Sequence, residues 1–396
     1  MGLLTAAAYA SLAAWLWLTL AQGMFWRTDV RLPPRTAPAR WPSVAIVVPA
    51  RDEAGVLARS LPSLLVQDYP GAAEVILVDD GSTDGTADLA LSLAAAHPGL
   101  PLTVVSPGDP GPGWTGKLWA LRHGIAHARD TGAAGTAAGT GPEFLLLTDA
   151  DIAHEPDSLR ELVAAATSAG LDLVSQMARL RVVTFWERLV VPAFVYFFAQ
   201  LYPFRRINRP AGRTAAAAGG CVLLRTEAAV RAGVPDSIRQ AVIDDVSLAR
   251  AVRRSGGRIW LGLAERVDSV RPYPALGDLW RMVSRSAYAQ LRHHPLLLAA
   301  AVAGLVLVYL VPPAALLAGL ATGRPAAAWA GGLAWLLMSG TYLPMLRYYR
   351  QPAALAPLLP FTALLYLLMT LDSASLHYRG RGAAWKGRTY ARPSDA

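Results

Sequence analysis

The chain has 396 residues, of which 54% are hydrophobic, so it is long enough for one large domain together with a membrane part. It contains a single cysteine, Cys221, which excludes a disulfide framework and a cysteine-based zinc site. The net charge is +9, and no zinc finger, helix-turn-helix or comparable motif is present, so the excess of lysine and arginine indicates anionic lipid or a phosphorylated substrate, not nucleic acid.

The first predicted element is a membrane-spanning helix within residues 1–24. Residues from Leu3 to Gln22 are almost wholly apolar and uncharged, and a helix of about 20 such residues crosses a bilayer. No basic residue precedes them, which argues against a cleaved signal peptide; a buried core helix is the alternative. A basic linker, residues 25–42, contains Arg27, Arg31, Arg35 and Arg40. By the positive-inside rule we expect a multi-pass protein of the cell (inner) membrane whose middle part faces the cytoplasm.

Strands alternate with helices in the middle of the chain. The first three predicted strands are Ser43–Pro49, Glu74–Val78 and Leu102–Val105. This alternation predicts an α/β fold with a mostly parallel sheet flanked by helices. Acidic residues follow the first two strands: Asp52, Glu53, Asp79 and Asp80. Open α/β sheets bind ligands at the carboxyl ends of their strands, so these acids are candidate ligand contacts.

A fourth buried strand, Phe144–Thr148, ends in two carboxylates one residue apart, Asp149 and Asp151. If the chain stays extended through them, both side chains project to the same side. Two close carboxylates repel unless a cation lies between them, and oxygen ligands of this kind suit Mg²⁺ or Mn²⁺ on a diphosphate. The alternative is an acidic loop that caps the next helix.

The next segments hold further candidates. An aromatic stretch, Thr184–Phe204, predicts an amphipathic helix in the membrane interface, with a core helix as the alternative. Gly219 and Gly220 allow a ligand to approach the backbone closely, and Cys221 after them begins a buried strand. Asp244 and Asp245 open a helix, where acids can also serve only the helix dipole. A basic amphipathic helix, Asp278–Gln290, carries Arg281 and Arg285 on one face.

Three apolar stretches then form a C-terminal membrane region, residues 292–372, with two or three spans: Pro295–Leu320, Ala326–Leu346 and Ala353–Leu371. The first contains Pro312 and Pro313 and is expected to break there. Three spans place the tail, residues 373–396, outside, yet its basic residues favour the cytoplasm. Either one stretch is re-entrant or interfacial, or the tail is an exception to the rule.

Taken in order, these motifs resemble the membrane-bound inverting glycosyltransferases of family 2, which have the GT-A fold. The resemblance covers about Ser43 to Leu291. It rests on five segments in a fixed order: Val48–Glu53, Asp79–Ser82, Asp149–Asp151, Gly219–Gly220 and Asp244–Asp245. The loop Gly113–Lys117 and the tail segment Trp385–Arg388 are similar to the hopanoid-associated branch, with the carotenoid (diaponeurosporenoate-type) glycosyltransferases as near relatives.

The resemblance implies a GT-A catalytic domain over residues 43–291, with the interfacial helix at about 184–204. It implies donor-nucleotide contacts from Pro49, Asp52, Glu53, Asp79, Asp80 and Asp149. Lys117 is a further candidate, as a contact to the leaving phosphate of the donor; for Lys117 and Arg285 a solvated surface position is the alternative. The resemblance also implies that Asp149 and Asp151 bind Mg²⁺ or Mn²⁺ and that Asp245, beside Asp244, is the general base. Acceptor or phosphate contacts are expected from Gly219, Gly220, Trp280, Arg281 and Arg285.

Two features depart from the family pattern. The base motif is Asp244–Asp245 where Glu-Asp is usual, so which carboxylate acts is open. The Gln-x-x-Arg-Trp motif of processive synthases is absent, which favours a single transfer, and the apolar segments favour a lipid acceptor such as a hopanoid or another polyprenyl-derived lipid. A sugar nucleotidyltransferase and a non-catalytic membrane protein remain as alternatives, although a Gly-rich loop after the first strand is missing and three strand ends carry acids.

Overall fold

The computed structural model describes residues 2–131, 141–379, 384–385 and 388–389. The chain forms two compact units. The sheet unit comprises residues 30–181, 207–272 and 384–396, and the helical unit comprises residues 1–29, 182–206 and 273–383. The segment 43–291, expected to be one catalytic domain, therefore contributes residues to both units.

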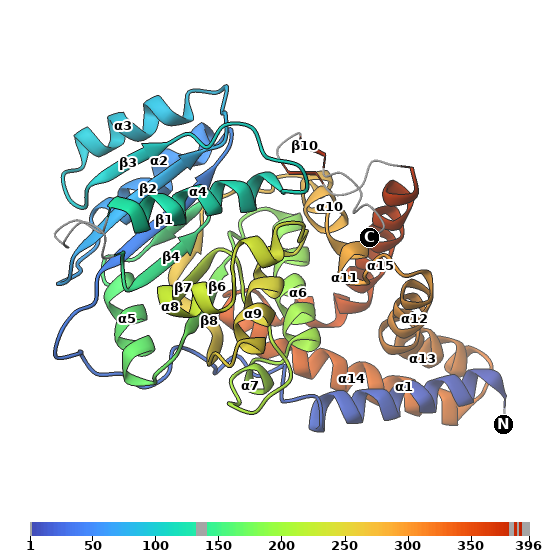
Figure 1. Ribbon diagram of the computed structural model, residues 1–396. Helices are drawn as coiled ribbons and strands as arrows, with labels where there is room; N and C mark the ends of the chain where they lie inside the picture. The colour runs from blue at the N-terminus through green and yellow to red at the C-terminus, as the bar shows by residue number, and fades with distance from the viewer. Residues whose placement is uncertain (1, 132–140, 380–383, 386–387, 390–396) are drawn as a thin grey trace. The chain divides into compact units, whose positions relative to one another are not determined.

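The sheet unit contains one large sheet, which has eight strands in the described part of the chain. Its strands are β1 (Val44–Ala50), β2 (Ala73–Asp79), β3 (Leu102–Val105), β4 (Phe144–Thr148), β5 (Ile152–His154), β6 (Leu173–Arg179), β7 (Cys221–Arg225) and β8 (Ile259–Ser269). They lie in the order β3-β2-β1-β4-β7-β6-β8-β5 (Figure 1). Only β5 and β7 of these strands run against the rest. The predicted mostly parallel α/β sheet is confirmed, and the other strands end at one common edge.

Helices cover both faces of this sheet. Helices α2 (Ala54–Leu65), α3 (Thr86–Ala96) and α5 (Ser158–Ser168) share a core with alternate strand residues such as Ile46. Helix α4 (Gly116–Thr131) packs on the opposite face, where a Cβ atom on Gly124 would lie only 2.5 Å from Val47 Cγ1. Burial on both faces explains why β1 is a continuous apolar run. Helices α8 (Thr226–Arg231) and α9 (Asp244–Arg254) complete the main helices of this unit.

The chain turns immediately after β4, so the condition of an extended backbone through Asp149 and Asp151 is not met. The Ile152 N–H donates to the Asp149 carbonyl at 3.1 Å, which closes a turn before β5 begins. Strand β5 then pairs antiparallel with β8, and this pairing forces the reversal. As a result the two carboxylates contact different cations, as described below.

A buried hydrogen-bonded chain fixes the end of β4. His154 lies 3.0 Å from Thr148 Oγ1 through Nε2 and 3.2 Å from Ser158 Oγ through Nδ1. The Thr148 hydroxyl donates to the Gly220 carbonyl at 2.8 Å, so the imidazole joins β4 to the Gly219–Gly220 loop. A neutral imidazole with hydrogen on Nε2 satisfies all three contacts. Burial lowers the pKa of His154 to about 4.

The pKa of His154 predicts how stability depends on pH. The unfolded chain takes up this proton near pH 6.5 and the folded chain only near pH 4, so protonation favours unfolding as pH falls through that window. Relative to His154→Gln, the wild type is expected to lose about 2 kcal/mol between pH 7 and pH 5. Thermal unfolding of both full-length proteins in detergent at the two pH values measures this difference. Unfolding temperatures that fall in parallel would contradict it.

The helical unit contains the apolar segments. Its helices are α1 (Leu3–Leu20), α6 (Phe185–Leu201), α10 (Leu276–Ser284), α11 (Ala287–Gln290), α12 (Pro295–Leu305), α13 (Val311–Ala321), α14 (Pro325–Tyr348) and α15 (Leu359–Tyr378). A short helix, α7 (Phe204–Ile207), follows α6. The helix expected over Asp278–Gln290 is divided into α10 and α11, because the chain leaves the helical conformation at Ser286.

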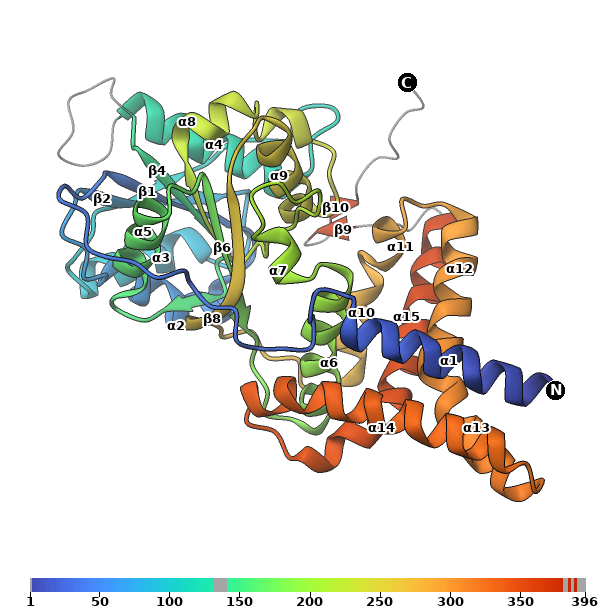
Figure 2. The same cartoon turned by 90° about the horizontal axis from the view of Figure 1, so that it is seen from below.

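The first C-terminal stretch breaks where its prolines predict. A π-helical turn, Val306–Leu310, separates α12 from α13, and Figure 2 shows the two helices running in different directions. Because Pro312 has no N–H to donate, the Val308 carbonyl lacks its usual helical partner. The buried Trp15 indole of α1 donates to this carbonyl at 2.7 Å. A side chain from the other end of the sequence therefore stabilises the break.

Helix α6 is enclosed by other helices of its unit. It begins with a capping box in which Thr184 and Glu187 exchange hydrogen bonds. Tyr196 OH lies 2.8 Å from Thr341 Oγ1 on α14, and Tyr366 OH of α15 donates to the Val190 carbonyl at 3.2 Å. These contacts match the core-helix alternative for the packing of α6. Its position at a membrane interface stays a prediction.

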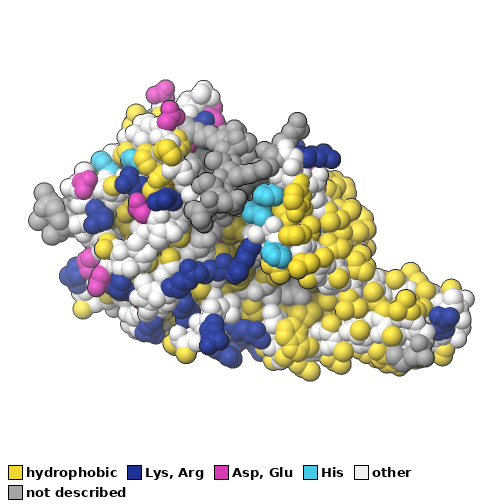
Figure 3. Space-filling model, turned by 45° about the vertical axis from the view of Figure 1, so that its right-hand side comes forward, with side chains coloured by type: hydrophobic (Ala, Val, Ile, Leu, Met, Phe, Trp, Pro, Cys, Tyr) yellow, Lys and Arg dark blue, Asp and Glu magenta, His cyan; other side chains and the backbone are white. Residues whose placement is uncertain are grey.

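Three helices in the described part of the chain are long and apolar enough to cross a membrane: Leu3–Leu20, Pro295–Ala321 and Ala353–Tyr378. The stretch Ala326–Leu346, expected to be a further span, lies in α14 and is not among the three. Figure 3 shows hydrophobic side chains gathered over the surface of the helical unit. Most of the predicted basic tail, including Lys386 and Gly387, lies outside the described residues; Ala384–Trp385 (β9) pairs with Arg388–Thr389 (β10).

Candidate active site

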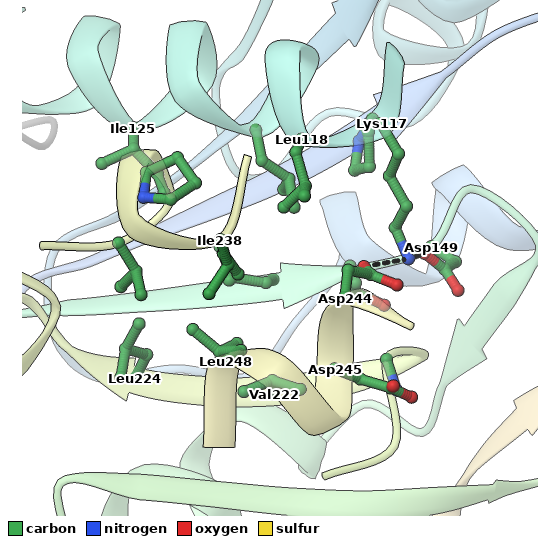
Figure 4. A pocket seen from close by; sticks show the side chains of 17 residues that line it. Lys117, Leu118, Ile125, Asp149, Val222, Leu224, Ile238, Asp244, Asp245 and Leu248 are labelled. Atoms are coloured by element: carbon green, nitrogen blue, oxygen red, sulfur yellow. Dashed lines mark hydrogen bonds and ion pairs between the residues drawn. The ribbon is translucent and has the colours of Figure 1, made fainter. Parts of the chain in front are cut away.

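The candidate site lies at the edge where six strands of the sheet unit end. Helix α4 supplies Lys117 in its first turn, the turn after β4 supplies Asp149, and α9 supplies Asp244 and Asp245 in its first turn. Figure 4 shows these four side chains at one end of a pocket. The sequence motifs that predicted them are far apart in the chain, and the shared sheet edge brings them together.

Lys117 links two of the carboxylates. Its Nζ atom lies 2.8 Å from Asp149 Oδ1 and 3.0 Å from Asp244 Oδ2 (Figure 4). The Lys117 side chain is only 18% exposed, and burial alone would lower its pKa, but the two carboxylates outweigh burial and raise it. Lys117 therefore stays charged. A compact ammonium fits between two carboxylates, and lysine is rare here, since the sequence contains only one other.

Asp245 differs from its neighbour Asp244 in its contacts. Its Oδ2 atom accepts a hydrogen bond from the Gly219 N–H at 2.9 Å, and Oδ1 accepts one from the Val246 N–H at 2.7 Å. Burial, followed by the charge of Asp244, raises the pKa of Asp245 to about 7. Such a carboxyl can take up and release a proton at neutral pH. Asp244 instead pairs with Lys117, so the geometry distinguishes the two adjacent acids.

Behind these charges lies a small apolar cavity of about 30 Å³. Its apolar lining includes Leu118, Leu121, Ile125, Val222, Leu224, Ile238 and Leu248, most of which Figure 4 labels. A volume of this size holds one or two water molecules. The cavity is therefore too small for a sugar nucleotide, and its apolar wall borders one side of Asp245 and Lys117.

The second acid of the pair, Asp151, belongs to another network. Its Oδ2 atom accepts hydrogen bonds from Arg271 Nε at 2.9 Å and from Ser269 Oγ at 3.2 Å. The same guanidinium donates from Nη2 to Glu53 Oε2 at 2.6 Å. Arg271 is not among the site residues predicted from the sequence, and it reaches this edge because β8 continues to Ser269. The signal available was an arginine shortly after a strand, in a chain whose other strand ends carry acids.

The loops after β1 and β2 bind to each other. Asp52 has a positive φ of 50° and accepts the Thr83 N–H at 2.8 Å, while its own N–H donates to Ser82 Oγ at 2.9 Å. Asp79 Oδ1 accepts the Ser82 N–H at 3.2 Å. Asp80 is fully buried beside Arg51. The Glu53 N–H donates to Thr86 Oγ1 at 2.9 Å. Thus four of the five predicted donor-binding acids form one loop cluster, all except Asp149, and their contact with a nucleotide stays a prediction.

The remaining predicted residues divide between the units. Pro49, near the end of β1, lines the cavity. The Gly220 carbonyl accepts a hydrogen bond from the Thr148 hydroxyl at the end of β4, next to the site. Trp280, Arg281 and Arg285 belong to the helical unit. There the Trp280 indole donates to Asp372 Oδ2 at 2.8 Å, and Arg281 pairs with Asp278 at 2.6 Å. Their acceptor or phosphate contacts stay predictions. Cys221 is buried in β7, and burial raises its thiol pKa to about 12, which is unsuited to a nucleophile.

The donor atoms at the site fit a divalent cation bound together with a diphosphate. The described residues contain no group of three or more His, Cys, Asp or Glu side chains placed to hold a metal ion by themselves. Mg²⁺ commonly takes only one or two protein carboxylates and completes its shell with water and phosphate oxygens. Asp149 and Asp151 are two such carboxylates. Each already forms an ion pair with a cationic side chain, Asp149 with Lys117 and Asp151 with Arg271.

Comparison with known proteins gives three findings. Residues 42–289 match the family described as Glycosyltransferase like family 2. The 4,4'-diaponeurosporenoate glycosyltransferases of Staphylococcus aureus strains RF122 / ET3-1 and MRSA252 are 39% and 38% identical over 87 residues. These matches cover 22% of this chain and 21% of each relative, so the chain matches about a fifth of their length.

The third finding is structural. The mannosyltransferase PcManGT from Pyrobaculum calidifontis, solved in complex with GDP-Man and Mn²⁺, superposes with a TM-score of 0.59 and 23% identity. The match covers 95% of this chain and 99% of that chain. At this identity the likeness shows the fold, and it agrees with the GT-A-type arrangement of the sheet unit.

Proposed function

The chain belongs to glycosyltransferase family 2, and we propose that it transfers a sugar from a nucleotide-diphosphate sugar to a membrane lipid with inversion at the anomeric carbon. The observation that carries this proposal is Asp245, a carboxyl whose pKa of about 7 and backbone contacts suit a general base. It lies beside Lys117 and Asp149, which hold opposite charges at the edge where a diphosphate would bind.

The proposed reaction is one displacement. The acceptor hydroxyl oxygen attacks the anomeric carbon from the face opposite the leaving group, and its proton passes to Asp245 as the new bond forms. The bond between the anomeric carbon and the diphosphate oxygen breaks, and the nucleotide diphosphate leaves with that electron pair. Asp244 does not compete for the proton, because its carboxylate is paired with Lys117.

Asp149 and Asp151 would hold Mg²⁺ or Mn²⁺. The ion would supply positive charge to the departing diphosphate. Lys117 is placed to add a further positive charge there, because its ammonium already contacts Asp149. The loops carrying Asp52, Glu53, Asp79 and Asp80 would orient the nucleotide. That PcManGT was solved with GDP-Man and Mn²⁺ supports this choice of donor class and metal.

A lipid acceptor is supported by the apolar helices and by the staphylococcal relatives, whose name specifies a carotenoid acid. Within this class we propose a hopanoid or another polyprenyl-derived lipid, on the resemblance of the Gly113–Lys117 loop and the Trp385–Arg388 segment. Arg27, Arg31, Arg35 and Arg40 support a position in the cell membrane with the catalytic residues on the cytoplasmic side. No nucleic acid partner is proposed.

An extraction assay tests the proposal. Purified full-length protein in detergent is incubated with a panel of radiolabelled nucleotide sugars, Mn²⁺ and a membrane lipid extract, and the organic phase is counted. We expect label in the organic phase with at least one donor and with the lipid extract only. NMR of that product is expected to show the anomeric configuration opposite to that of the donor. Label that stays in the aqueous phase with every donor would contradict a lipid acceptor.

A further inference from the structure

Arg271 connects two acidic groups that belong to different parts of the proposed site. It lies two residues after the end of β8 and donates from Nε to Asp151 and from Nη2 to Glu53, at 2.9 Å and 2.6 Å. Glu53 follows β1 and belongs to the loop cluster proposed to bind the donor nucleotide. Asp151 follows β4 and belongs to the pair proposed to bind the metal. One guanidinium therefore spans both parts.

The surroundings of Arg271 restrict its movement. The side chain is 26% exposed, while the Glu53 and Asp151 side chains are 8% and 14% exposed. The backbone helps as well, because the Val270 N–H donates to the Asp151 carbonyl at 2.8 Å and Ser269 Oγ donates to its carboxylate. Residues 269–271 thus contact both the main chain and the side chain of Asp151.

We propose that Arg271 is a positioning residue for metal and donor binding, which holds Asp151 and Glu53 in the arrangement that the metal–diphosphate complex requires. The inference rests on the proposed function and assigns to it a residue outside the family motifs described above. Carboxylates that bind metals are oriented by hydrogen bonds to groups that do not touch the metal, and loss of such a partner typically weakens metal binding about 10–100-fold.

The contacts of Arg271 and Ser269 with Asp151 orient its carboxylate and do not block metal binding. Both side-chain contacts of Asp151 among the described residues use Oδ2. The other oxygen, Oδ1, can therefore bind a cation while Arg271 and Ser269 keep the carboxylate in place. The planar guanidinium reaches two acids with two separate nitrogens, which the single ammonium of lysine cannot reproduce.

The test measures Mn²⁺ binding directly. Electron paramagnetic resonance of free Mn²⁺ is recorded during titration of full-length protein in the presence of GDP or UDP. We expect Arg271→Gln to bind Mn²⁺ about 10–100-fold more weakly than the wild type, and Arg271→Lys to recover little of this loss. Arg266→Gln is the matched control, because Arg266 also lies at β8 and pairs with a single acid, Asp157, at 2.9 Å. It should bind Mn²⁺ as the wild type does.

Kinetics separate positioning from a purely structural role. In Arg271→Gln the Mn²⁺ concentration for half-maximal transfer should rise by a similar factor, while kcat at saturating Mn²⁺ stays within about threefold of the wild type. If Arg271→Gln does not fold, Glu53→Gln provides the second variant, since it removes one anchor of the guanidinium. Mn²⁺ binding should then weaken by at least about threefold.

The outcomes are distinct. Unchanged or tighter Mn²⁺ binding in Arg271→Gln would overturn the positioning role while wild-type transfer still supports the proposed function. Absence of Mn²⁺ binding in a wild type that still transfers sugar would overturn the inference and the assignment of Mn²⁺ to Asp149 and Asp151, while the sugar transfer itself would stand. Absence of both Mn²⁺ binding and transfer in the wild type would overturn the inference and the proposed function together.

Discussion

Replacement of Asp245 by Asn is expected to lower turnover by roughly 10²–10⁴-fold while nucleotide binding stays nearly unchanged. The amide keeps the size of the side chain and can still accept the Gly219 N–H, but it cannot take the acceptor proton. Turnover comes from the extraction assay, and binding comes from titration with the nucleoside diphosphate. Asp244→Asn is the matched comparison, and it should cost less because Asp244 is held by Lys117.

The pH dependence of the wild type gives a second measure of this assignment. Since burial and the charge of Asp244 raise the pKa of Asp245 to about 7, kcat/KM should rise with pH and reach half its maximum near pH 7. Turnover of Asp245→Asn near the wild-type value would remove Asp245 from the base role. A larger loss in Asp244→Asn than in Asp245→Asn would assign the base to Asp244.

Replacement of Lys117 by Met is expected to destabilise the folded protein by about 1–3 kcal/mol. Removal of one partner of a fully buried ion pair lowers the free energy of unfolding by about 3–5 kcal/mol. The expected loss is smaller here because the Asp149 side chain is 35% exposed. Asp149 and Asp244 then face each other without the cation between them. Mn²⁺ with a nucleoside diphosphate should restore part of the loss, because it brings positive charge back to Asp149.

The Lys117 prediction is measured as the unfolding temperature in detergent, with and without Mn²⁺ and GDP or UDP. Arg122→Met is the matched control on the same helix, because Arg122 pairs with Asp236 at the surface and exposed pairs contribute at most about 1 kcal/mol. An unfolding temperature of Lys117→Met equal to that of the wild type would show that the three charges do not stabilise one another.

The sheet could be predicted from the sequence because its strands are short apolar runs that end in polar turns. Val44–Ala50 and Phe144–Thr148 are buried on both faces, which produces the continuous hydrophobic pattern that identifies them. The acids that follow them reach one edge because parallel strands end together. The hydrophobic pattern of each strand agrees with its place in the parallel sheet. The candidate acids could therefore be predicted from the order of the motifs along the chain.

The partners of those acids could not be predicted in the same way. The turn at Asp149 depends on the pairing of β5 with β8. These two strands are more than 100 residues apart in the sequence, and Ile152 pairs with Ser269. Arg271 contacts Asp151 only because β8 extends to that edge, and the indole of Trp15 reaches the Val308 carbonyl across 293 residues of sequence. Contacts of this kind follow from tertiary packing and leave no periodic signal.

The most direct test of the central claim is the extraction assay run on the wild type and Asp151→Ala, each with Mn²⁺ and with a chelator. We expect transfer to lipid that requires the metal, releases one nucleotide diphosphate for each sugar transferred, and is lost in Asp151→Ala. Equal transfer with and without metal, or full activity in Asp151→Ala, would contradict the assignment of the acids at this sheet edge.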